Sequence, residues 1–328
     1  MRGSFRFFLN FSEQSLFTSL RRSSYSPFML TFKPITLHDR DLINRYLNKQ
    51  NYRASDLCFT NLYCWGSKFD TRFAVENGWL FIRFRDNNGR NSYLKPIGEG
   101  IIREGVQAIL EDHKQFDTLF QMRGLTREMN DEIEAVMPGL FDYKLNRSVS
   151  DYIYTTEKLT HLKGKKLQSK RNHINRFMRE NDWKYKSLTG HPEIVKECKA
   201  MLDDWMEMNR EEKDPSLMYD DHATTLMLDH FEELELRGGL ICVDNKIAAF
   251  TIGEPLTEDT IIVHVEKAFT TIHGAYTIIN QQFAEHETKG YTYINREEDM
   301  GLDNLRKAKL SYQPDILLEK FNARLKNH

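Results

Sequence analysis

The sequence is poor in several features that would assign a protein to a class directly. It has only four cysteines among 328 residues, and the pair Cys58-x5-Cys64 has no partner pair with the spacing of a zinc site. We therefore expect reduced thiols in a cytosolic protein, and no metal site. No run of about 18 apolar residues occurs, which argues against a membrane-spanning helix. The formal net charge is only −2, so the chain as a whole is neither strongly basic nor strongly acidic.

What the sequence does contain is typical of a soluble globular protein with two cores. Hydrophobic residues make up 40% and charged residues 29%, and the length fits two units of roughly 130 to 150 residues. We predict an N-terminal domain over residues 30–157 and a C-terminal domain over residues 158–328. Residues 1–29 lack the apolar run of a signal peptide, so we interpret them as a weakly ordered leader, with Met29 as an alternative start. We expect a cytoplasmic protein, with peripheral contact to a membrane as an alternative.

Basic residues are concentrated in one segment, residues 158–179, which contains no acidic residue. Its cations are Lys158, Lys163, Lys165, Lys166, Lys170, Arg171, Arg176 and Arg179. On a helical wheel the segment has an apolar stripe made of Leu167, Ile174, Phe177 and Met178. Three cations fall on or beside this stripe, namely Lys163, Lys170 and Arg171. We favour a polar cleft or anion site for these three over a surface position or a carboxylate partner, whereas a solvated face explains the outer cations equally well.

Hydrophobic periodicity and turn residues predict the same order of elements in both halves of the chain. In the first half the predicted helices are 36–49, 55–65, 101–112 and 126–136, and the predicted strands are 72–75, 79–85, 92–96, 118–124 and 142–154. In the second half the predicted helices are 192–210, 221–237, 273–288 and 302–310, and the predicted strands are 240–243, 247–253, 260–266, 291–295 and 316–325. This order resembles the acetyltransferase-type (GNAT) α/β fold in tandem, an α+β architecture. We expect the basic segment to run along a cleft between the two units.

One loop bears on the use of coenzyme A. An acyl-CoA transferase of this fold carries Arg or Gln, two residues, Gly, one residue, then Gly or Ala, where the backbone N–H groups of a helix start bind pyrophosphate. The corresponding sequence here is Thr271-Ile272-His273-Gly274-Ala275-Tyr276, in which only Gly274 fits. We therefore expect no CoA site at this loop.

A second dense stretch covers residues 295–311, with three consecutive acids followed by a basic helix. These acids, Glu297, Glu298 and Asp299, follow a predicted strand, where α/β folds present functional groups. A carboxylate in such a position can share a proton or orient an amine, although a solvated loop is the alternative. Strand alternation places His264 and Glu266 on one face of an earlier strand.

These motifs resemble those of a known family. The strings KGKK...KRNHINRF, IGEPL...HVEKA...GAY..IN and INREEDMG...LRKAK.SY.P are similar to those of the DUF2156 family, which is related to the C-terminal domain of phosphatidylglycerol lysyltransferases. The resemblance covers most of residues 30–325. The sequence has no counterpart of the transmembrane region of those enzymes. The motif positions that it implies are Lys163, Lys166, Lys170, Arg171, Asn172, Asn175, Glu266, Lys267, Asn295, Arg296, Glu297, Glu298, Asp299, Arg306 and Lys309.

The resemblance implies a tandem GNAT fold and transfer of an amino acid from aminoacyl-tRNA to a lipid head group or another amine or hydroxyl acceptor. An aminoacyl ester is already activated, so such an enzyme needs alignment and oxyanion stabilisation more than a metal or a bound cofactor. We predict Glu298, Asp299 and Glu266 as catalytic residues, and the remaining motif positions together with His264 as substrate-binding residues. An acyl-CoA-dependent N-acyltransferase and a non-catalytic protein that binds nucleic acid or an anionic ligand are the alternatives.

Overall fold

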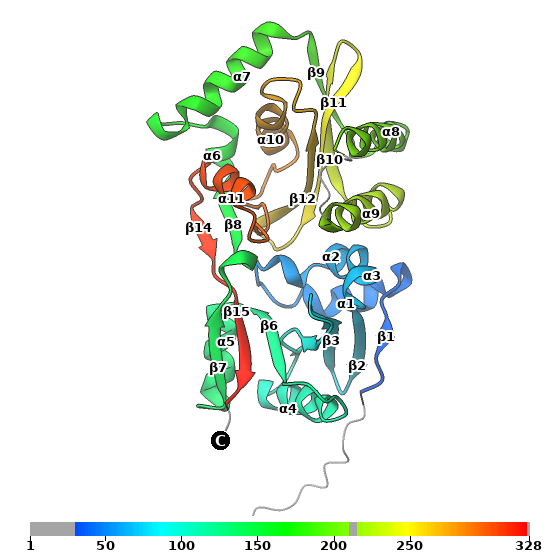
Figure 1. Cartoon of the computed structure of the whole chain (residues 1–328), viewed down its shortest axis with the longest axis vertical. Helices are drawn as coiled ribbons and strands as arrows, with labels where there is room; N and C mark the ends of the chain where they lie inside the picture. Colours follow the sequence, from blue (N-terminus) through cyan, green and yellow to red (C-terminus); the bar gives the residue numbers. More distant parts are fainter. Residues whose placement is uncertain (1–29, 210–214, 327–328) are drawn as a thin grey trace, which may run out of the picture.

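The structure, a computed structural model, describes residues 30–209 and 215–326. The predicted leader, residues 1–29, lies outside the described residues. Figure 1 shows two α/β units stacked along the long axis of the molecule, each built on one mixed sheet. None of the helices in the described ranges is long and apolar enough to cross a membrane. The predicted fold class, a mixed α/β protein made of two GNAT-like units, is confirmed.

The first unit follows the predicted order closely. Its sheet contains β1 (Lys33–Pro34), β2 (Arg72–Glu76), β3 (Trp79–Arg85), β4 (Asn91–Tyr93), β5 (Ile97–Gly98), β6 (Gln121–Leu125), β7 (Phe141–Leu145) and β15 (Phe321–Leu325). Its α-helices are α1 (Arg40–Leu47), α2 (Phe59–Cys64), α3 (Gly66–Phe69), α4 (Ile102–His113) and α5 (Arg127–Val136). The chain is capped before α1, because Asp39 Oδ2 accepts hydrogen bonds from the backbone N–H of Thr36 at 2.9 Å and from its hydroxyl at 2.7 Å.

The second unit repeats this plan on a sheet of its own. The strands are β8 (Asp151–Thr155), β9 (Trp183–Ser187), β10 (Arg237–Val243), β11 (Lys246–Pro255), β12 (Thr260–Ala268), β13 (Tyr293–Asn295) and β14 (Ile316–Leu318). The α-helices are α6 (Thr156–His161), α7 (Gln168–Glu180), α8 (Pro192–Met208), α9 (Pro215–Asp229), α10 (Ala275–His286) and α11 (Asp303–Leu310). Short 3₁₀ helices cover Leu37–Asp39, Ser55–Leu57, Arg147–Val149 and Lys165–Leu167.

Two elements of the second unit differ from the prediction. The edge strand β9 was missed, because its charged residues Lys184 and Lys186 are exposed and only alternate side chains contact protein. The helix predicted at 221–237 is displaced toward the N-terminus, since α9 ends at Asp229 and turns follow it.

Each sheet contains one parallel pair in the same place. In the first sheet β4 runs parallel to β6, and in the second β12 runs parallel to β13. On one side of each parallel pair lies an antiparallel meander, β2–β3–β4 or β10–β11–β12. The repeated topology expected from the sequence is therefore present in both units.

The units exchange strands at two points, which the sequence analysis did not anticipate. The stretch predicted as one strand at 142–154 divides into β7, which pairs in the first sheet, and β8, which pairs in the second. The stretch predicted at 316–325 likewise divides into β14 in the second sheet and β15 in the first. Figure 1 shows the red β15 beside β7, in the other unit from β14. The sheets thus change over near residues 146–150 and 319–320, whereas the domain limit predicted after residue 157 stays a prediction.

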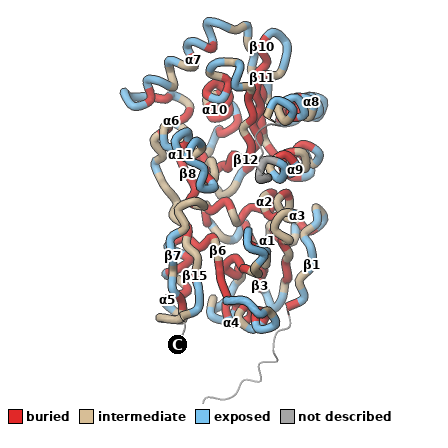
Figure 2. The backbone as a smooth tube through the Cα atoms, in the orientation of Figure 1, coloured by how far each residue is buried: buried red, intermediate tan, exposed pale blue. Residues whose placement is uncertain are grey.

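Two apolar clusters hold the fold together. One is continuous from the first unit to the face of the second sheet covered by α8 and α9, and it includes Phe73, Met122, Leu202 and Val265. The other lies between the second sheet and α10, and it includes Phe283. Figure 2 shows buried chain concentrated in the sheets and where the units meet. Because the first cluster crosses both units, apolar burial stabilises their relative placement.

Helix α7, the basic helix, lies at the end of the molecule farthest from the first unit (Figure 1). The expectation that the basic segment runs between the units is therefore wrong. The predicted apolar stripe is correct for Leu167, Ile174 and Phe177, which pack in the cluster formed with α10, but Met178 is 46% exposed. Most of the remaining helix surface is exposed, as Figure 2 shows in pale blue.

Candidate functional site

The second sheet opens where its two parallel strands part. Strands β12 and β13 pair only from Thr260↔Tyr293 to Ile262↔Asn295. Beyond that point β12 continues beside β11, while the chain after β13 stays against β8. Side chains from both strands meet across this opening. The carboxyl ends of parallel strands are a common location for ligand sites in α/β folds.

An ion pair bridges the opening on the side facing α10. Arg296 donates to Glu266 Oε2 through Nε at 3.1 Å and also through an Nη atom, and Asn280 of α10 donates to Glu266 Oε1 at 3.1 Å. The guanidinium of Arg296 lies 4.9 Å from the ring centroid of Tyr312, and Lys170 Nζ of α7 lies 4.1 Å from the same centroid. We call the group Lys170, Glu266, Arg296 and Tyr312 the cation–aromatic site. Glu266 is thus an ion-pair partner here, and its predicted catalytic role stays a prediction.

Lys170 is the cation in this site that lacks a counter-ion. Its side chain is half-buried, and within the described parts of the chain no carboxylate forms an ion pair with it. Burial, together with the positive charge of Arg296, lowers the pKa of Lys170. A half-buried ammonium held by aromatic contact alone is a good partner for an anionic ligand, which agrees with the prediction for this residue.

The other two cations predicted beside the stripe are used differently. Lys163 forms an exposed ion pair with Glu157 at 3.0 Å. Arg171 donates to the backbone carbonyls of Leu162 and Gly164 and so secures the turn before α7. The remaining positions on this segment that the resemblance implies are exposed, namely Lys166, Asn172 and Asn175. Of the cations predicted to lie beside the apolar stripe, Lys170 is therefore the one that contacts residues of the opening.

Asp299 is the centre of a saturated network that we call the arginine knot. Its carboxylate accepts from Arg147 at 3.1 Å and from Arg306 at 2.8 and 3.0 Å. The Tyr152 hydroxyl and the N–H of Gly301 also donate to it. Burial would raise the pKa of Asp299, but these hydrogen bonds lower it to about 2. A fully buried carboxylate with its acceptor positions filled is poorly suited to take a proton, so the geometry argues for a structural role in place of the predicted catalytic one.

Glu298, the neighbouring acid, has the opposite environment. Burial raises its pKa to about 7 against the opposing charge of Lys320, and nearby carboxylates such as Glu297 add to the increase. Its hydrogen-bond partner is the Ser55 hydroxyl, at 3.5 Å from Oε2. A half-buried carboxyl that titrates near neutral pH is suited to general acid–base chemistry, which supports its predicted role.

Glu298 belongs to a polar cluster at the two strand crossovers, which we call the unit junction: Ser55, Asp56, Asp151, Asn295, Glu298 and Lys320. Lys320 lies between β14 and β15, and Asp151 begins β8, so their 2.7 Å ion pair joins the two exchanged segments. Both side chains are almost fully buried, and Asp151 also accepts from the N–H and the hydroxyl of Ser55. This network connects both units to the loop that carries Glu298.

Two predicted substrate-binding residues instead shape that loop. Asn295 accepts from the N–H of Glu297 at 2.7 Å. Lys309 donates to the backbone carbonyl of Arg296 at 2.6 Å and to that of Glu298. Glu297 has a φ of 56°, a left-handed conformation that costs energy for a residue other than glycine. These bonds therefore maintain a strained turn that presents Glu298.

His264 lies outside the cation–aromatic site. A register shift in the pairing with β11 makes it an extra residue in β12, and its ring bonds Glu254 at 2.9 Å and Glu297 at 2.8 Å. This bulge interrupts the alternation that was expected to align His264 with Glu266, and the two side chains have no hydrogen-bond partner in common in the described structure. Burial would lower the pKa of His264, but hydrogen bonds with a neighbouring thiol and with the two carboxylates raise it well above the ordinary value.

Lys267 is buried on the side of the sheet covered by α8 and α9. It pairs with Asp220, lies 3.5 Å from Asp221, and is 3.8 Å from the ring centroid of Trp205. Because these partners already neutralise its charge, its contacts favour a structural role over the predicted substrate-binding one.

The loop corresponding to a CoA pyrophosphate site is covered by protein. Gly274 precedes α10 with a φ of 85°, and a Cβ there would lie 2.8 Å from the carbonyl oxygen of His173 in α7. His173 Nδ1 and His273 Nε2 are 2.9 Å apart, and this contact also joins α7 to the loop before α10. Helix α7 therefore packs directly on the start of α10.

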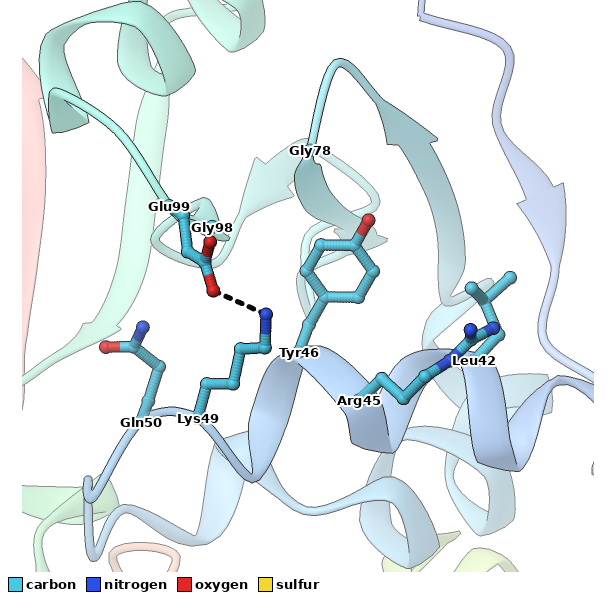
Figure 3. A pocket seen from close by; sticks show the side chains of 8 residues that line it. All are labelled: Leu42, Arg45, Tyr46, Lys49, Gln50, Gly78, Gly98 and Glu99. Carbon is cyan, nitrogen blue, oxygen red and sulfur yellow. Dashed lines mark hydrogen bonds and ion pairs between the residues drawn. The ribbon is translucent and has the colours of Figure 1, made fainter.

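A separate shallow hollow lies on the first unit, between α1 and the turns next to β3 and β5. Figure 3 shows Lys49 and Glu99 paired there, with the ring of Tyr46 beside them. The lining residues, all within the described first unit, include no residue predicted for the site. The hollow is thus separate from the opening between β12 and β13.

Several participating residues were missed in the sequence analysis. They are Ser55, Cys58, Arg147, Asp151, Glu254, Tyr312 and Lys320. Most lie far along the chain from the dense motifs, and no local pattern marks them. Glu254 and Tyr312 are the exceptions, because they belong to the strings IGEPL and LRKAKLSYQP, which were recognised as motifs.

Comparison with known proteins identifies a family that this chain matches. Residues 48–324 match the family model described as phosphatidylglycerol lysyltransferase, C-terminal. A crystal structure of a conserved protein of unknown function from Bacteroides thetaiotaomicron is 41% identical with a TM-score of 0.85, and the match covers 91% of this chain and 100% of that one. The structure of L-PGS from Bacillus licheniformis is 18% identical with a TM-score of 0.62, and the match covers 88% of this chain and 93% of that one, which supports the fold.

A curated relative matches over a shorter range. It is an uncharacterized protein of Mycoplasmoides gallisepticum, 23% identical over 190 residues, which amount to 54% of this chain and 56% of that protein. The chain therefore spans about half the length of the curated relative that it matches.

Proposed function

This chain belongs to the family of phosphatidylglycerol lysyltransferase C-terminal domains, and we propose that it transfers an amino acid from aminoacyl-tRNA to an amine or hydroxyl acceptor. The acceptor that we favour is an anionic lipid head group, and a peptide amine is the second choice. The proposal rests on the family together with the environments of Lys170 and Glu298 in the second unit.

The single observation that carries the proposal is the environment of Lys170. Its ammonium is half-buried beside Arg296 and Tyr312 and, among the residues that the structure describes, has no carboxylate partner. A phosphate would neutralise it, and exposed cations of the same segment, including Lys166 and Arg179, would extend the contact along a nucleic-acid backbone. The terminal phosphates of a tRNA and the phosphate of a lipid head group both meet this requirement.

The chemistry needs one proton acceptor. The N–H or O–H of the acceptor attacks the ester carbonyl, a new C–N or C–O bond forms, the ester C–O bond breaks, and the ribose hydroxyl of the tRNA leaves. In our proposal Glu298 takes the proton from the attacking group and returns it to the leaving oxygen. A carboxyl with a pKa of about 7 is partly ionised at neutral pH, so it is able to do both.

The CoA-dependent alternative receives no support from the start of α10. The backbone N–H groups of Ala275, Thr277 and Ile278 already bond carbonyls of the preceding turn, and α7 covers the adjacent loop. We expect acetyl-CoA to give no saturable heat in calorimetry up to about 1 mM, a limit of roughly −4 kcal/mol. Binding at micromolar concentration would contradict this expectation and favour the acyl-CoA transferase.

The proposal is tested by incubating the full chain with a mixed pool of charged tRNA, phosphatidylglycerol vesicles and a peptide mixture. Mass spectrometry of the lipids and peptides identifies any aminoacylated product and separates the two acceptor classes. Lys49→Gln is a control, because Lys49 is a surface lysine paired with Glu99 on the first unit. We expect product with the unchanged chain and with this control, and about 100-fold less with Glu298→Gln.

Two outcomes would refute the transferase. One is the absence of aminoacylated lipid or peptide with the whole pool of charged tRNA, and the other is equal product formation by Glu298→Gln and the unchanged chain. Tight tRNA binding without turnover would instead favour the non-catalytic binder.

A further inference from the structure

Three side chains from separate elements converge near the start of α2, at a distance in the fold from the basic helix. Cys58 immediately precedes α2 in the first unit, whereas Glu254 of β11 and His264 of β12 belong to the second. Their ligand-type atoms all lie within 4.8 Å of one another. Cys58 Sγ is 2.8 Å from Glu254 Oε1 and 3.9 Å from His264 Nε2, and the latter two atoms are 2.9 Å apart.

We propose that Cys58, Glu254 and His264 form a binding site for a divalent transition-metal ion, of which Zn²⁺ is the best match. Thiolate, imidazole and carboxylate are the ligand types of protein zinc sites, whereas Mg²⁺ and Ca²⁺ prefer oxygen ligands alone. In a tetrahedral zinc site such donors are separated by roughly 3.3 to 3.6 Å, so Glu254 needs to withdraw by only about 0.5 Å. The spacing of the cysteines did not predict this site, because the partners of Cys58 come from other parts of the chain.

The histidine is oriented as a metal-binding histidine usually is. Its Nδ1 bonds Glu297 Oε1 at 2.8 Å, which leaves Nε2 directed at the other two candidates. Glu297 is itself held by the side-chain amide of Asn61 at 2.8 Å. A carboxylate behind the distal ring nitrogen fixes the tautomer and orientation of the imidazole in many metal sites.

The local backbone favours this arrangement too. His264 is the extra residue of the β12 bulge, which directs its side chain out of the regular alternation. The strand opposite requires Gly253, since a Cβ at that position would lie 2.2 Å from the carbonyl oxygen of Ile262. A glycine thus permits the close approach of β11 and β12 at the bulge.

Two more buried polar side chains border the candidates. The hydroxyl of Thr60 is buried and hydrogen-bonds Glu254. Asn61, whose amide nitrogen holds Glu297, has a buried Oδ1 atom without a hydrogen-bond partner. Such an atom is uncommon in folded proteins, and a water that completes a four-coordinate metal would supply it with a donor.

Charge balances when the metal binds. Without metal, the imidazolium of His264 faces the carboxylates of Glu254 and Glu297, and Cys58 is a thiol. Binding of one Zn²⁺ releases the Nε2 proton of His264 and the Sγ proton of Cys58, so that the ion, the thiolate and the Glu254 carboxylate sum to zero. Because the ligands come from both units, the ion would also join the units.

The test uses the full chain treated with a chelator and then titrated with Co²⁺ alone. We expect a thiolate-to-cobalt charge-transfer absorption that saturates at one ion per chain, release of two protons per ion, and loss of the absorption when Zn²⁺ is added. Cys58→Ser abolishes the absorption, whereas Cys198→Ser, which alters another buried cysteine, retains it. Glu297→Gln weakens cobalt binding by about 10- to 100-fold.

The proposal is overturned if no saturable spectral change occurs up to about 1 mM Co²⁺, or if Cys58→Ser keeps the charge-transfer absorption. In either case the cluster is only an imidazolium held by two carboxylates. The test stays decisive if Cys58→Ser does not fold, since the absorption and the proton release are both measured on the unchanged chain. Neither readout depends on transferase activity.

Discussion

The adjacent acids Glu298 and Asp299 belong to two regions with opposite electrostatics. In the arginine knot, Asp299 accepts from two arginines, a tyrosine and a backbone N–H, and its pKa falls to about 2. At the unit junction, Glu298 is close to other carboxylates and its pKa rises to about 7. Since the two residues are neighbours in one acidic run, a carboxylate acquires a structural or a chemical role from its partners in space.

Replacing Lys320 should disrupt the polar contacts of the unit junction. Of the substitutions below, we expect it to lower the free energy of unfolding the most. Lys320→Met leaves the fully buried Asp151 carboxylate without its ion-pair partner, so we expect the free energy of unfolding to fall by about 3 to 5 kcal/mol. Urea denaturation measures the change. Lys326→Met is the control. Lys326 lies close to Lys320 in the chain, but its ion pair with the exposed Asp142 is long, at 3.9 Å, and such surface pairs contribute little. Equal losses in the two variants would show that the buried pair has no special weight.

Glu298→Gln should separate chemistry from stability at the unit junction. We expect transfer to slow by about 100-fold, and the rate of the unchanged chain to rise with pH through about 7 as Glu298 ionises. The folded-state pKa lies above the value of 4.5 in the unfolded chain, so ionisation of Glu298 costs stability as pH rises. The variant should therefore unfold at the same or a higher temperature at pH 8.

The matched control for that variant is Glu319→Gln, which alters an exposed carboxylate paired with Arg127. It should leave the rate and its pH profile unchanged. A Glu298→Gln variant that loses rate and melting temperature together would place Glu298 among the structural acids, beside Asp299.

Asp299→Asn should show the opposite pattern to Glu298→Gln. It should lower the free energy of unfolding at neutral pH, and it should change substrate affinity less than it changes stability. Asp299 has a folded-state pKa of about 2 against 3.8 unfolded, so its contribution is fully present above about pH 5 and is lost as pH falls through 3.8 toward 2. This difference corresponds to about 2 kcal/mol. Urea denaturation of the variant and the unchanged chain at pH 7 and at about pH 2 should show the difference in the free energy of unfolding narrowing at the lower pH, and a difference that widens would contradict the knot.

Lys170→Gln should give the smallest effect, confined to the cation–aromatic site. If Lys170 contacts one phosphate of single-stranded tRNA, the slope of log K against log salt should fall by about 0.7. Filter binding at four salt concentrations measures it, and Lys49→Gln, remote on the first unit, should keep the original slope. Arg171→Gln, by contrast, should loosen the turn before α7, because Arg171 holds the carbonyls of Leu162 and Gly164.

Local patterns in the sequence were sufficient for much of the fold. Asn77, Gly78 and Gly89 adopt the positive φ that tight hairpin turns need, and the strands predicted at 72–75, 79–85 and 92–96 pair as the meander β2–β3–β4. Periodicity likewise located α4, α5, α8 and α10 to within a few residues, because each buries one apolar face. The crossovers were not predictable in this way, since β7 and β8, or β14 and β15, read as continuous strand whichever sheet they join.

Sequence motifs likewise located some residues of the candidate site and misjudged the role of others. The motifs led to Lys170, Arg296 and Glu298, which the structure places at the opening or at the unit junction. They gave equal weight to Asp299 and Lys267, whose charges are neutralised by partners distant in sequence. The sequence by itself therefore determined the order of elements, the family and the candidate groups, because these depend on short-range patterns. Only the tertiary structure decided which groups are free to act, because pairing and burial depend on residues such as Asp151 and Lys320 that meet across 169 positions of the chain.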